Sequence, residues 1–497
     1  MKICFFLQRR FAYIGHDLAV NLKNRHGIEN FCAYVLGRPS YRFLTSQKEI
    51  NYTSLLLDED LHAKAKGEKL DLGYIKFLEK EYGIPNLWPY IEVDRVIRFN
   101  QLVREYPMEA TKYSHEEMMT LIQVRAKAII AMLEKEMPDY LFCTVVGGIG
   151  GLLLFNIAKK MGVKVRMIMP SKIGTSYTIS GTYDSFTEID KEFDSIMAAG
   201  RRVENYDKAK TVLDEFRANP THYAKMTGFY LNRARQIKQL DFLLPSKMKR
   251  YLVWLFGRIQ YYFQYQDKYD YIYIKTLPKI KDQVVRKLRA VHGVHDLYDT
   301  IDPDNEDFAF FPLHMEPETT LLLFAYRYTN QIEVIKQVAK SLPIHFKLYV
   351  KEHPRMVGFR TRAYYQELKK IPNVKLVDPQ VSSLQLAAKS KLVTVITGSV
   401  GWEALQLKIP VITFGGVFFN KLSMVKRCDS YDRLSDIVKE QLENFYYHEE
   451  EIVNYIGLIL KHSVFVDLRH LWHRESNEQK KRKDLAVLAD LIANHIQ

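Results

Sequence analysis

The chain has 497 residues, of which 47% are hydrophobic and 26% charged, and its formal net charge is +14. This composition is typical of a globular protein, and the length predicts at least two large domains because single cores rarely grow past about 250–300 residues. No run of about 18 uncharged apolar residues occurs, so we expect neither a spanning helix nor, at the short apolar start, a signal peptide.

The cysteines and the basic residues indicate the cellular environment in which the protein works. The four cysteines are scattered, at Cys4, Cys32, Cys143 and Cys428. They form no CxxC pair, which argues against a structural zinc site or a disulfide framework and fits a reducing cytosol. The basic excess is densest from Lys247 to Arg289, where it is interleaved with Tyr and Phe. Such a mixture suits a membrane surface, or a solvated helix face whose tyrosines pack inward, and no nucleic-acid motif accompanies it.

Residues 1–240 read as an N-terminal α/β domain on the acceptor side of a two-domain protein. We predict strands at 2–7 and 30–36, a loop at 8–15, a helix starting at His16 and Asp17, an insertion with short helices at 58–108, and a long helix at 114–137. Ser114 can cap the long helix, with Glu117 as its capping-box partner. A strand–loop–helix start is how a doubly wound domain begins.

A glycine-rich loop at 147–151 follows the strand that begins after Pro138. Glycines occupy 148 and 150, but position 153 is Leu, so the GxGxxG dinucleotide pattern fails. We predict a tight turn with close backbone approach that lines an acceptor cleft. A helix at 152–161 and a strand at 163–169 follow, and 181–244 reads as mostly helical.

Residues 241–300 read as a basic, aromatic, helical linker, and 301–430 as a second, nucleotide-sugar-binding α/β domain. The predicted strands lie at 308–314, 346–350, 374–377, 392–396 and 410–414, with helices at 330–342, 361–369, 401–407 and one beginning at 383. This alternation predicts a second parallel sheet. Residues 431–497 predict helices without a further strong strand.

Three strand-end loops of the second domain carry the polar side chains that can meet a ligand. They are Pro312-Leu-His314-Met-Glu316, Lys351-Glu-His353-Pro354 and Thr397-Gly398-Ser399-Val-Gly401-Trp-Glu403. In an open parallel sheet, ligands bind at the carboxyl ends of strands, where such loops gather. Their arrangement predicts one site for a small anionic ligand.

Each residue type has a role in anion binding. Pro354 disfavours helix at His353 and holds its imidazole over the strand end, while Lys351 adds positive potential. The hydroxyls of Thr397 and Ser399 lie at a predicted helix start, where backbone N–H groups and the helix dipole favour an anion.

Gly398 and Gly401 allow close approach of a phosphate. Glu403 either accepts hydrogen bonds from ribose or sugar hydroxyls, or is only a favourable charge at a helix start.

Three residues are candidates for acid–base catalysis: His314, Glu316 and Asp17. Asp17 can activate an acceptor hydroxyl, although acidic residues also favour helix starts, and the same alternative applies to Glu316. The pair Asp302 and Asp304 lies in an acidic linker rather than after a strand. We therefore predict no metal and no cofactor other than the donor substrate.

These three motifs, followed by Ile409-Pro-Val-Ile, resemble the bacterial capsule polysaccharide biosynthesis family, which includes the Kdo transferases that build capsule lipid anchors. The resemblance is concentrated between about 308 and 420. It implies an α/β, GT-B-like fold of two doubly wound Rossmann-like domains facing a cleft, with C-terminal helices. It also implies that His353, Thr397, Ser399 and Glu403 hold the donor nucleotide, often CMP. At 314 this chain has His where the capsule Kdo enzymes lead us to expect Gln, which leaves a UDP- or GDP-sugar open.

The resulting hypothesis is a cytoplasmic, metal-independent glycosyltransferase that moves a sugar from a nucleotide-sugar donor to a surface polysaccharide or its lipid anchor, with peripheral contact to the inner membrane face. A non-hydrolysing nucleotide-sugar epimerase shares the two-domain plan. A non-catalytic scaffold of polysaccharide export is the alternative from another class. No nucleic-acid partner is expected.

Overall fold

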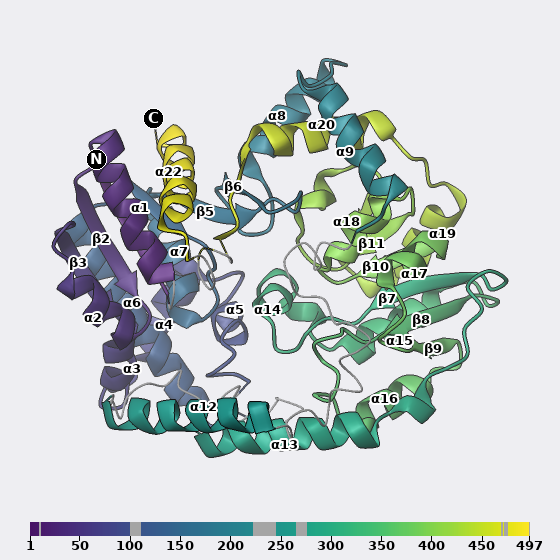
Figure 1. The fold of residues 1–497 in the computed structure, drawn as a ribbon, viewed down its shortest axis with the longest axis horizontal. Helices are drawn as coiled ribbons and strands as arrows, with labels where there is room; N and C mark the ends of the chain where they lie inside the picture. The colour runs from purple at the N-terminus through teal and green to yellow at the C-terminus, as the bar shows by residue number, and fades with distance from the viewer. Residues whose placement is uncertain are drawn as a thin grey trace.

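Two sheets organise the chain in the computed structural model, which describes residues 1–8, 11–99, 111–221, 245–264, 276–468, 471 and 476–496. Each sheet is covered by helices, and the sheets lie in separate halves of the molecule (Figure 1). The first sheet contains β1 (Lys2–Leu7), β2 (Asn30–Val35), β3 (Tyr52–Leu57), β4 (Tyr140–Cys143), β5 (Lys164–Pro170), β6 (Ser176–Ser180) and β13 (Ser463–Phe465). The second contains β7 (Phe308–Pro312), β8 (Lys347–Lys351), β9 (Val374–Val377), β10 (Leu392–Val395), β11 (Val411–Thr413) and β12 (Val425–Arg427).

Both sheets have the strand order of a doubly wound fold. The second is parallel throughout, in the order β12-β11-β10-β7-β8-β9. The first has the order β13-β6-β5-β4-β1-β2-β3, in which only the pairs β5–β6 and β6–β13 are antiparallel. After β3 the chain returns to add β4 on the other side of β1, and after β9 it returns to add β10 on the other side of β7. These two positions are the switch points at which such folds bind ligands. The predicted pair of Rossmann-like sheets is confirmed.

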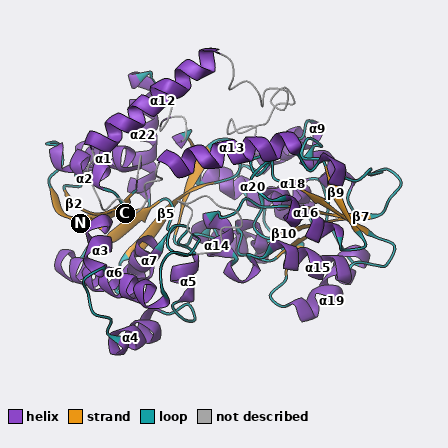
Figure 2. Cartoon of the chain, turned by 90° about the horizontal axis from the view of Figure 1, so that it is seen from below, coloured by secondary structure: helices purple, strands orange, loops and turns teal. Residues whose placement is uncertain are grey.

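Helices pack on both faces of each sheet, as Figure 2 shows. The helices of the first half are α1 (Phe11–His26), α2 (Arg38–Ser46), α3 (Asp58–Ala65), α4 (Leu72–Tyr82), α5 (Trp88–Glu92), α6 (His115–Glu136) and α7 (Ile149–Lys160). Those of the second half are α14 (Thr319–Phe324), α15 (Gln331–Ser341), α16 (Arg362–Lys369), α17 (Ser383–Lys389), α18 (Ser399–Gln406) and α19 (Leu434–Glu443). The capping box of Ser114 and Glu117 is present at the start of α6.

The chain crosses between the halves more than once. Helices α8 (Thr187–Ala198) and α9 (Tyr206–Ala218) pack against α20 (Glu449–Lys461), and their apolar residues share a core with the second sheet. After α20 the chain returns, because β13 joins the first sheet and α22 (Glu478–Asn494) packs on α1. A short strand, β13, is therefore present in the stretch for which no further strong strand was predicted. The signal is weak because β13 has only three residues, Ser463–Phe465.

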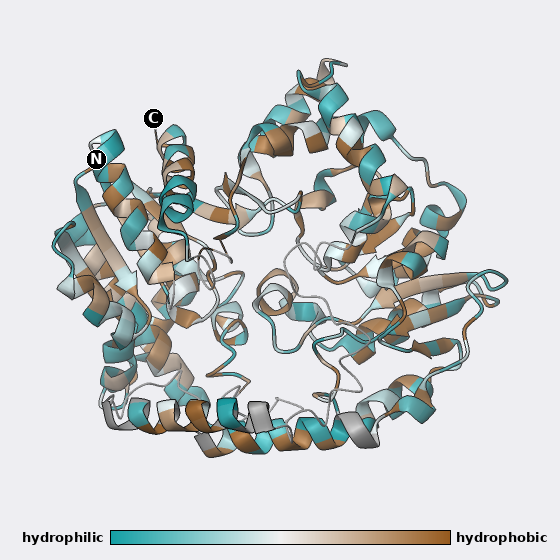
Figure 3. Cartoon of the chain, in the orientation of Figure 1, coloured by the Kyte–Doolittle hydropathy of each residue, from teal (hydrophilic) through white to brown (hydrophobic). Residues whose placement is uncertain are grey.

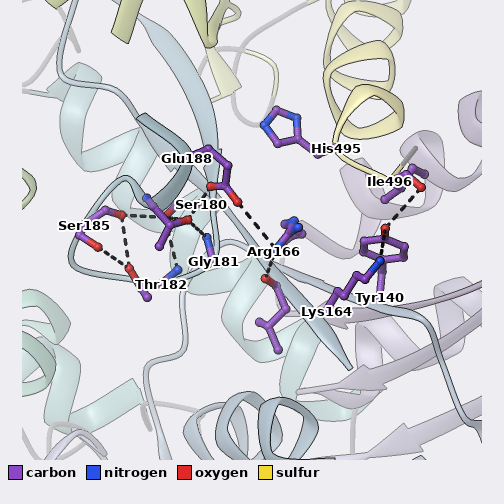
Figure 4. A network of polar contacts seen from close by, with 12 residues as sticks. Tyr140, Lys164, Arg166, Ser180, Gly181, Thr182, Ser185, Glu188, His495 and Ile496 are labelled. Carbon is purple, nitrogen blue, oxygen red and sulfur yellow. Dashed lines mark hydrogen bonds and ion pairs between the residues drawn. The ribbon is translucent and has the colours of Figure 1, made fainter. Parts of the chain in front are cut away.

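The first crossing, after β6, is fastened by a polar network (Figure 4). Ser180 Oγ donates to the carbonyl of Ser185 at 2.7 Å, and the N–H of Gly181 donates to Thr187 Oγ1 at 2.8 Å. Arg166 on β5 lies 3.9 Å from Glu188 of α8. These contacts hold a short loop, 181–186, that reaches the second domain.

The start of α1 differs from its prediction. The helix begins at Phe11, so Gly15, His16 and Asp17 lie inside it rather than in or next to a cleft-facing loop. A Cβ on Gly15 would lie 2.4 Å from Leu7 Cδ2. The glycine therefore serves close packing of α1 on β1, and residues 9–10 lie outside the described residues.

The predicted helical linker is present as α12 (Pro245–Gln264) and α13 (Thr276–His292), which run along the lower edge of the molecule in Figure 1. Residues 222–244, part of a stretch predicted to be helical, lie outside the described residues. None of the described helices combines the length and the apolar character needed to cross a bilayer.

Candidate functional site

The strand order brings the three predicted loops together. Because β10, β7 and β8 are neighbours, the residues that follow them, Thr397, His314 and His353, end up side by side at the carboxyl edge of the second sheet. The β10–β7 boundary is also the switch point of this sheet. The grouping expected from the sequence is therefore found in the structure.

His314 is a buried, neutral hydrogen-bond donor. Its Nε2 accepts a hydrogen bond of 3.0 Å from the backbone N–H of Thr397. The imidazole proton therefore lies on Nδ1, and this buried atom has no hydrogen-bond partner within the described part of the chain. Burial, aided by the charge of Arg360, lowers the pKa of His314 to about 4.

His353 has the opposite tautomer. Its Nδ1 accepts a hydrogen bond of 3.2 Å from the backbone N–H of Arg355, which leaves the proton on Nε2. Burial, followed by the effects of His314 and Arg355, lowers the pKa of His353 to about 3. Pro354 opens the turn that follows. The two loops thus present two neutral imidazoles, each with one N–H to donate.

The N-terminus of α18 adds further donors. Gly398 is the N-cap residue and Ser399 the first helical residue, so the first-turn N–H groups face the loop that carries Thr397. Thr397 Oγ1 is a second buried polar atom without a hydrogen-bond partner among the residues described. A helix N-terminus attracts anions through these N–H groups and its dipole, and the two histidine loops lie beside it.

Three predicted ligand residues are buried or closely packed in this structure. A Cβ on Gly401 would lie 2.9 Å from both Phe419 and Val395, so this glycine is needed for packing α18 on β10. Glu403 is 2% exposed on the inner side of α18. Lys351 is 3% exposed, and its burial lowers its pKa to about 8. Glu403 and Lys351 are buried, as His314 is, and their roles in ligand binding stay predictions.

A buried arginine, which the sequence did not single out, ties the two histidine loops together. Arg360 donates to the carbonyl oxygen of His314 at 2.6 Å and hydrogen-bonds the carboxylate of Glu352. The same carboxylate accepts a 2.6 Å hydrogen bond from the N–H of His353 and a 2.7 Å bond from Tyr365. The sequence signal that could have revealed Arg360 is Glu352, next to His353. A carboxylate that is buried there requires a cation as its partner.

Glu316 belongs to the same support. Its carboxylate lies 3.3 Å from Arg360 and accepts a hydrogen bond from Gln331. Gln331 also accepts the N–H of His314 at 2.7 Å. Glu316 therefore positions the loop of His314, and its candidacy as an acid or base stays a prediction.

Asp17 lies away from this group. It is on α1 beside α22, where burial raises its pKa and the charge of Lys481 acts against that rise. Its other charged neighbours are His16, Glu478 and Glu49. The structure does not bring Asp17 together with the histidine loops.

The two domains meet through the loops that follow β4 and β6 in the first sheet and through residues that follow β7 and β11 in the second. A Cβ on Gly147 would lie 2.8 Å from Thr319, and one on Gly416 would lie 2.6 Å from Asp184. The rings of Tyr183 and Phe324 stack at a centroid distance of 5.7 Å. In the glycine loop at 147–151, Gly147 thus closely approaches the second domain, whereas a Cβ on Gly150 or Gly151 would meet Tyr34 or Phe6 of the first domain. The role of this loop in lining an acceptor cleft stays a prediction.

Glu318, at this junction, is a candidate catalytic carboxylate that was not among the residues predicted from the sequence. It is the N-cap of α14, next to Thr319. Burial raises its pKa, while Lys172 and Arg95 of the first domain and Arg355 of the second act against that rise. A partly buried carboxylate among cations of both domains is the kind of group that serves acid–base catalysis.

No metal cluster is evident within the described ranges, where no group of three or more His, Cys, Asp and Glu side chains is suitably arranged. Asp304 of the linker pair is bound by Lys389 at 2.5 Å. Metal independence stays a prediction.

Residues 259–432 match the model of a family described as "Capsule polysaccharide biosynthesis protein". The resemblance carried by the three motifs is confirmed over this segment. No curated protein matches the chain. Among solved structures, the β-Kdo 2,7-transferase KpsC of Thermosulfurimonas dismutans is 13% identical, covering 80% of this chain and 96% of its own, with a TM-score of 0.37. A UDP-GlcNAc 2-epimerase of Neisseria meningitidis bound to UDP-GlcNAc is 12% identical, covering 93% and 99%, with a TM-score of 0.25.

Proposed function

We propose that this protein is a metal-independent glycosyltransferase that takes a sugar from a nucleotide-sugar donor and transfers it to a surface polysaccharide or its lipid anchor on the cytoplasmic side of the membrane. The observation that carries the proposal is the pair of oppositely protonated neutral imidazoles, His314 and His353, beside the N-terminus of α18. The family match over 259–432 supports the substrate class.

In this proposal the donor phosphate binds beside His314, His353 and the N-terminus of α18. Nδ1–H of His314, Nε2–H of His353, the hydroxyl of Thr397 and the first N–H groups of α18 offer hydrogen bonds to phosphate oxygens. Such groups stabilise the negative charge that develops on the departing nucleotide when the glycosidic bond breaks. Because the imidazoles are neutral, their contribution is directional hydrogen bonding, and Arg355 supplies the positive charge near His353.

The acceptor hydroxyl is placed at the junction of the domains, where Glu318 serves as general base. Removal of the hydroxyl proton by a carboxylate in the transition state is ordinary general base catalysis. Lys172 and Arg95 favour the ionised form of Glu318. Glu318 is a better candidate base than Asp17, because Glu318 lies at the domain junction whereas Asp17 lies beside α22.

Donor identity is tested by a thermal-shift panel of CMP, UDP, GDP and CDP on the purified protein. We expect one nucleotide to raise the melting temperature, because a ligand that binds only the native state stabilises it. His353→Ala should abolish that shift and transfer while keeping the melting temperature of the free protein close to wild type. Retained transfer in the purified variant would overturn the assignment.

The epimerase and scaffold alternatives can be distinguished from a glycosyltransferase by turnover and binding measurements. A nucleotide-sugar epimerase converts its UDP-sugar without an acceptor, whereas a glycosyltransferase requires one for product. A scaffold protein binds none of the four nucleotides by calorimetry. A thermal shift with CMP and no acceptor-free turnover supports a CMP-linked donor.

A further inference from the structure

We propose that the exposed faces of α12 and α13 form one docking surface for an anionic lipid bilayer. Both helices lie along one edge of the molecule, away from the sheets, and Figure 2 views the protein from that side. They touch each other, since Lys279 Nζ of α13 lies 4.9 Å from the ring centre of Trp254 of α12. The inference deepens the proposed function by naming the surface at which its acceptor is presented.

The outer face of α12 is apolar. Leu252, Val253, Phe256 and Ile259 are 61%, 66%, 70% and 47% exposed. Spacings of three and four residues place these side chains on one side of a helix, and Trp254, between them in sequence, is only partly exposed. Four large apolar side chains on one helix face form a contiguous patch, a feature that marks interaction sites rather than ordinary surface.

The outer face of α13 continues the pattern. Leu277, Val284 and Leu288 are 78%, 52% and 53% exposed, and Lys281 is exposed as well. These four residues are separated by four, three and four positions, so they lie on one face of the helix.

The opposite face of α13 is anchored on the second domain. Arg289 donates to the carbonyl of Phe359 at 2.7 Å, and the Arg286 guanidinium lies 4.1 Å from the Phe359 ring. Asp282, which pairs with Arg286, is buried. One side of α13 is therefore used for packing, and the other is left for a partner.

The charge of the helices identifies an anionic bilayer as that partner. The sequence of α12 contains four basic residues and no acidic one. That of α13 contains five basic residues, of which Arg286 and Arg289 pack on the second domain, and only Asp282 as an acid. Lys249 and Arg250 are exposed at the start of the apolar stripe of α12. Apolar residues flanked by Lys and Arg are the pattern of helices that lie in a lipid interface, where basic residues are attracted to anionic headgroups. Figure 3 shows hydrophobic segments recurring along both helices at this edge.

Docking along these helices sets the orientation of the enzyme. The α12–α13 pair spans from beneath the first domain to the neighbourhood of α16 in the second (Figure 1). Both domains are then held over the same bilayer, and a lipid-linked acceptor meets the domain junction from this edge.

The test is vesicle flotation of the full-length protein with phosphatidylcholine vesicles, with and without phosphatidylglycerol. We expect binding only to the anionic vesicles and its loss at high salt. The double variant Leu252→Glu/Phe256→Glu should reduce binding at least tenfold. Ile344→Glu is the matched control, because Ile344 is 99% exposed on a different part of the surface and should have no effect.

Two results would overturn the proposal. One is equal vesicle binding by wild type and the double variant. The other is a wild-type protein that ignores vesicles but forms a dimer, measured by light scattering, that the double variant dissociates; the patch would then bind a second copy. The nucleotide thermal shift is measured on every variant, and its retention separates a failure of docking from a failure of the proposed donor site.

Discussion

The backbone N–H of Thr397 donates a 3.0 Å hydrogen bond to Nε2 of His314, and this contact determines which proton the imidazole offers. It joins the loop after β10 to the loop after β7 across the switch point of the second sheet. With Nε2 occupied, His314 can donate only through Nδ1. The neutral ring is thereby fixed as a directional donor at the start of α18.

The imidazoles of buried His314 and partly buried His353 should make stability depend on pH. The pKa of His314 is lowered to about 4 and that of His353 to about 3, whereas unfolded histidine titrates near 6.5. Below about pH 6.5 the unfolded chain binds more protons, so the stability present above that pH is lost as the pH falls toward 4 and then 3. We expect the melting temperature to fall over this window.

His314→Gln tests the assignment of that pH dependence. Glutamine retains an acceptor for the N–H of Thr397 and an N–H to donate, but it does not titrate. The variant should fold and should lose stability less steeply between about pH 6.5 and 4. Identical pH profiles for the two proteins would contradict the role assigned to the His314 pKa.

Lys351 should be dispensable for nucleotide binding. It is 3% exposed, and its folded pKa of about 8 lies below the value of about 10.4 for an unfolded lysine. The unfolded lysine takes up its proton at a higher pH than the folded one, so wild type loses about 3 kcal/mol of stability as the pH falls from about 10.4 toward 8. Lys351→Met should not show this loss, and its nucleotide affinity should stay within about twofold of wild type. A tenfold loss of affinity by calorimetry would restore the predicted phosphate contact.

The Arg125–Asp58 pair should dominate the stability of the first domain. Both side chains are 1% exposed, and Arg125 donates to both carboxylate oxygens at 2.8 and 3.0 Å. Arg125→Met leaves a buried, uncompensated carboxylate and should cost about 3–5 kcal/mol in urea unfolding. The matched control is Arg25→Met, because the Arg25–Asp490 pair is about half exposed and its loss should cost less than about 1 kcal/mol. Equal costs would refute the burial argument.

The sequence predicts the second domain better than the first, for physical reasons. Its strands are short apolar runs with helices between them, so strand order follows from the rules of parallel sheets and brings His314, His353 and Thr397 together. The role of a glycine is harder to predict from sequence, because glycine is found where the backbone needs conformational freedom, where elements pack closely and where a ligand approaches. Gly401 was predicted to allow phosphate approach, and the structure shows that it also serves close packing, because Phe419 and Val395 fill the space a Cβ would need.

Long-range packing explains the remaining errors. The start of α1 at Phe11 and the pairing of Ser463–Phe465 with β6 depend on surfaces far apart in sequence. Arg360 is recognised only when its partners, the loops of His314 and Glu352, are seen in space. Glu318 lacked a signal for the same reason, because the cations that define its environment include Lys172 and Arg95 from the other domain.

Glu318→Gln should separate catalysis from donor binding. Glutamine preserves the shape of the side chain but cannot take up the proton of the acceptor hydroxyl, so kcat should fall about 100-fold or more. The nucleotide affinity should be unchanged. In wild type, the rate should rise with pH through the raised pKa of Glu318, because only the ionised carboxylate acts as a base. Glu318→Asp should retain part of the activity and the same pH profile. If Glu318→Gln keeps kcat or weakens nucleotide binding in parallel, Glu318 is a structural cap of α14 and the base lies elsewhere at the domain junction.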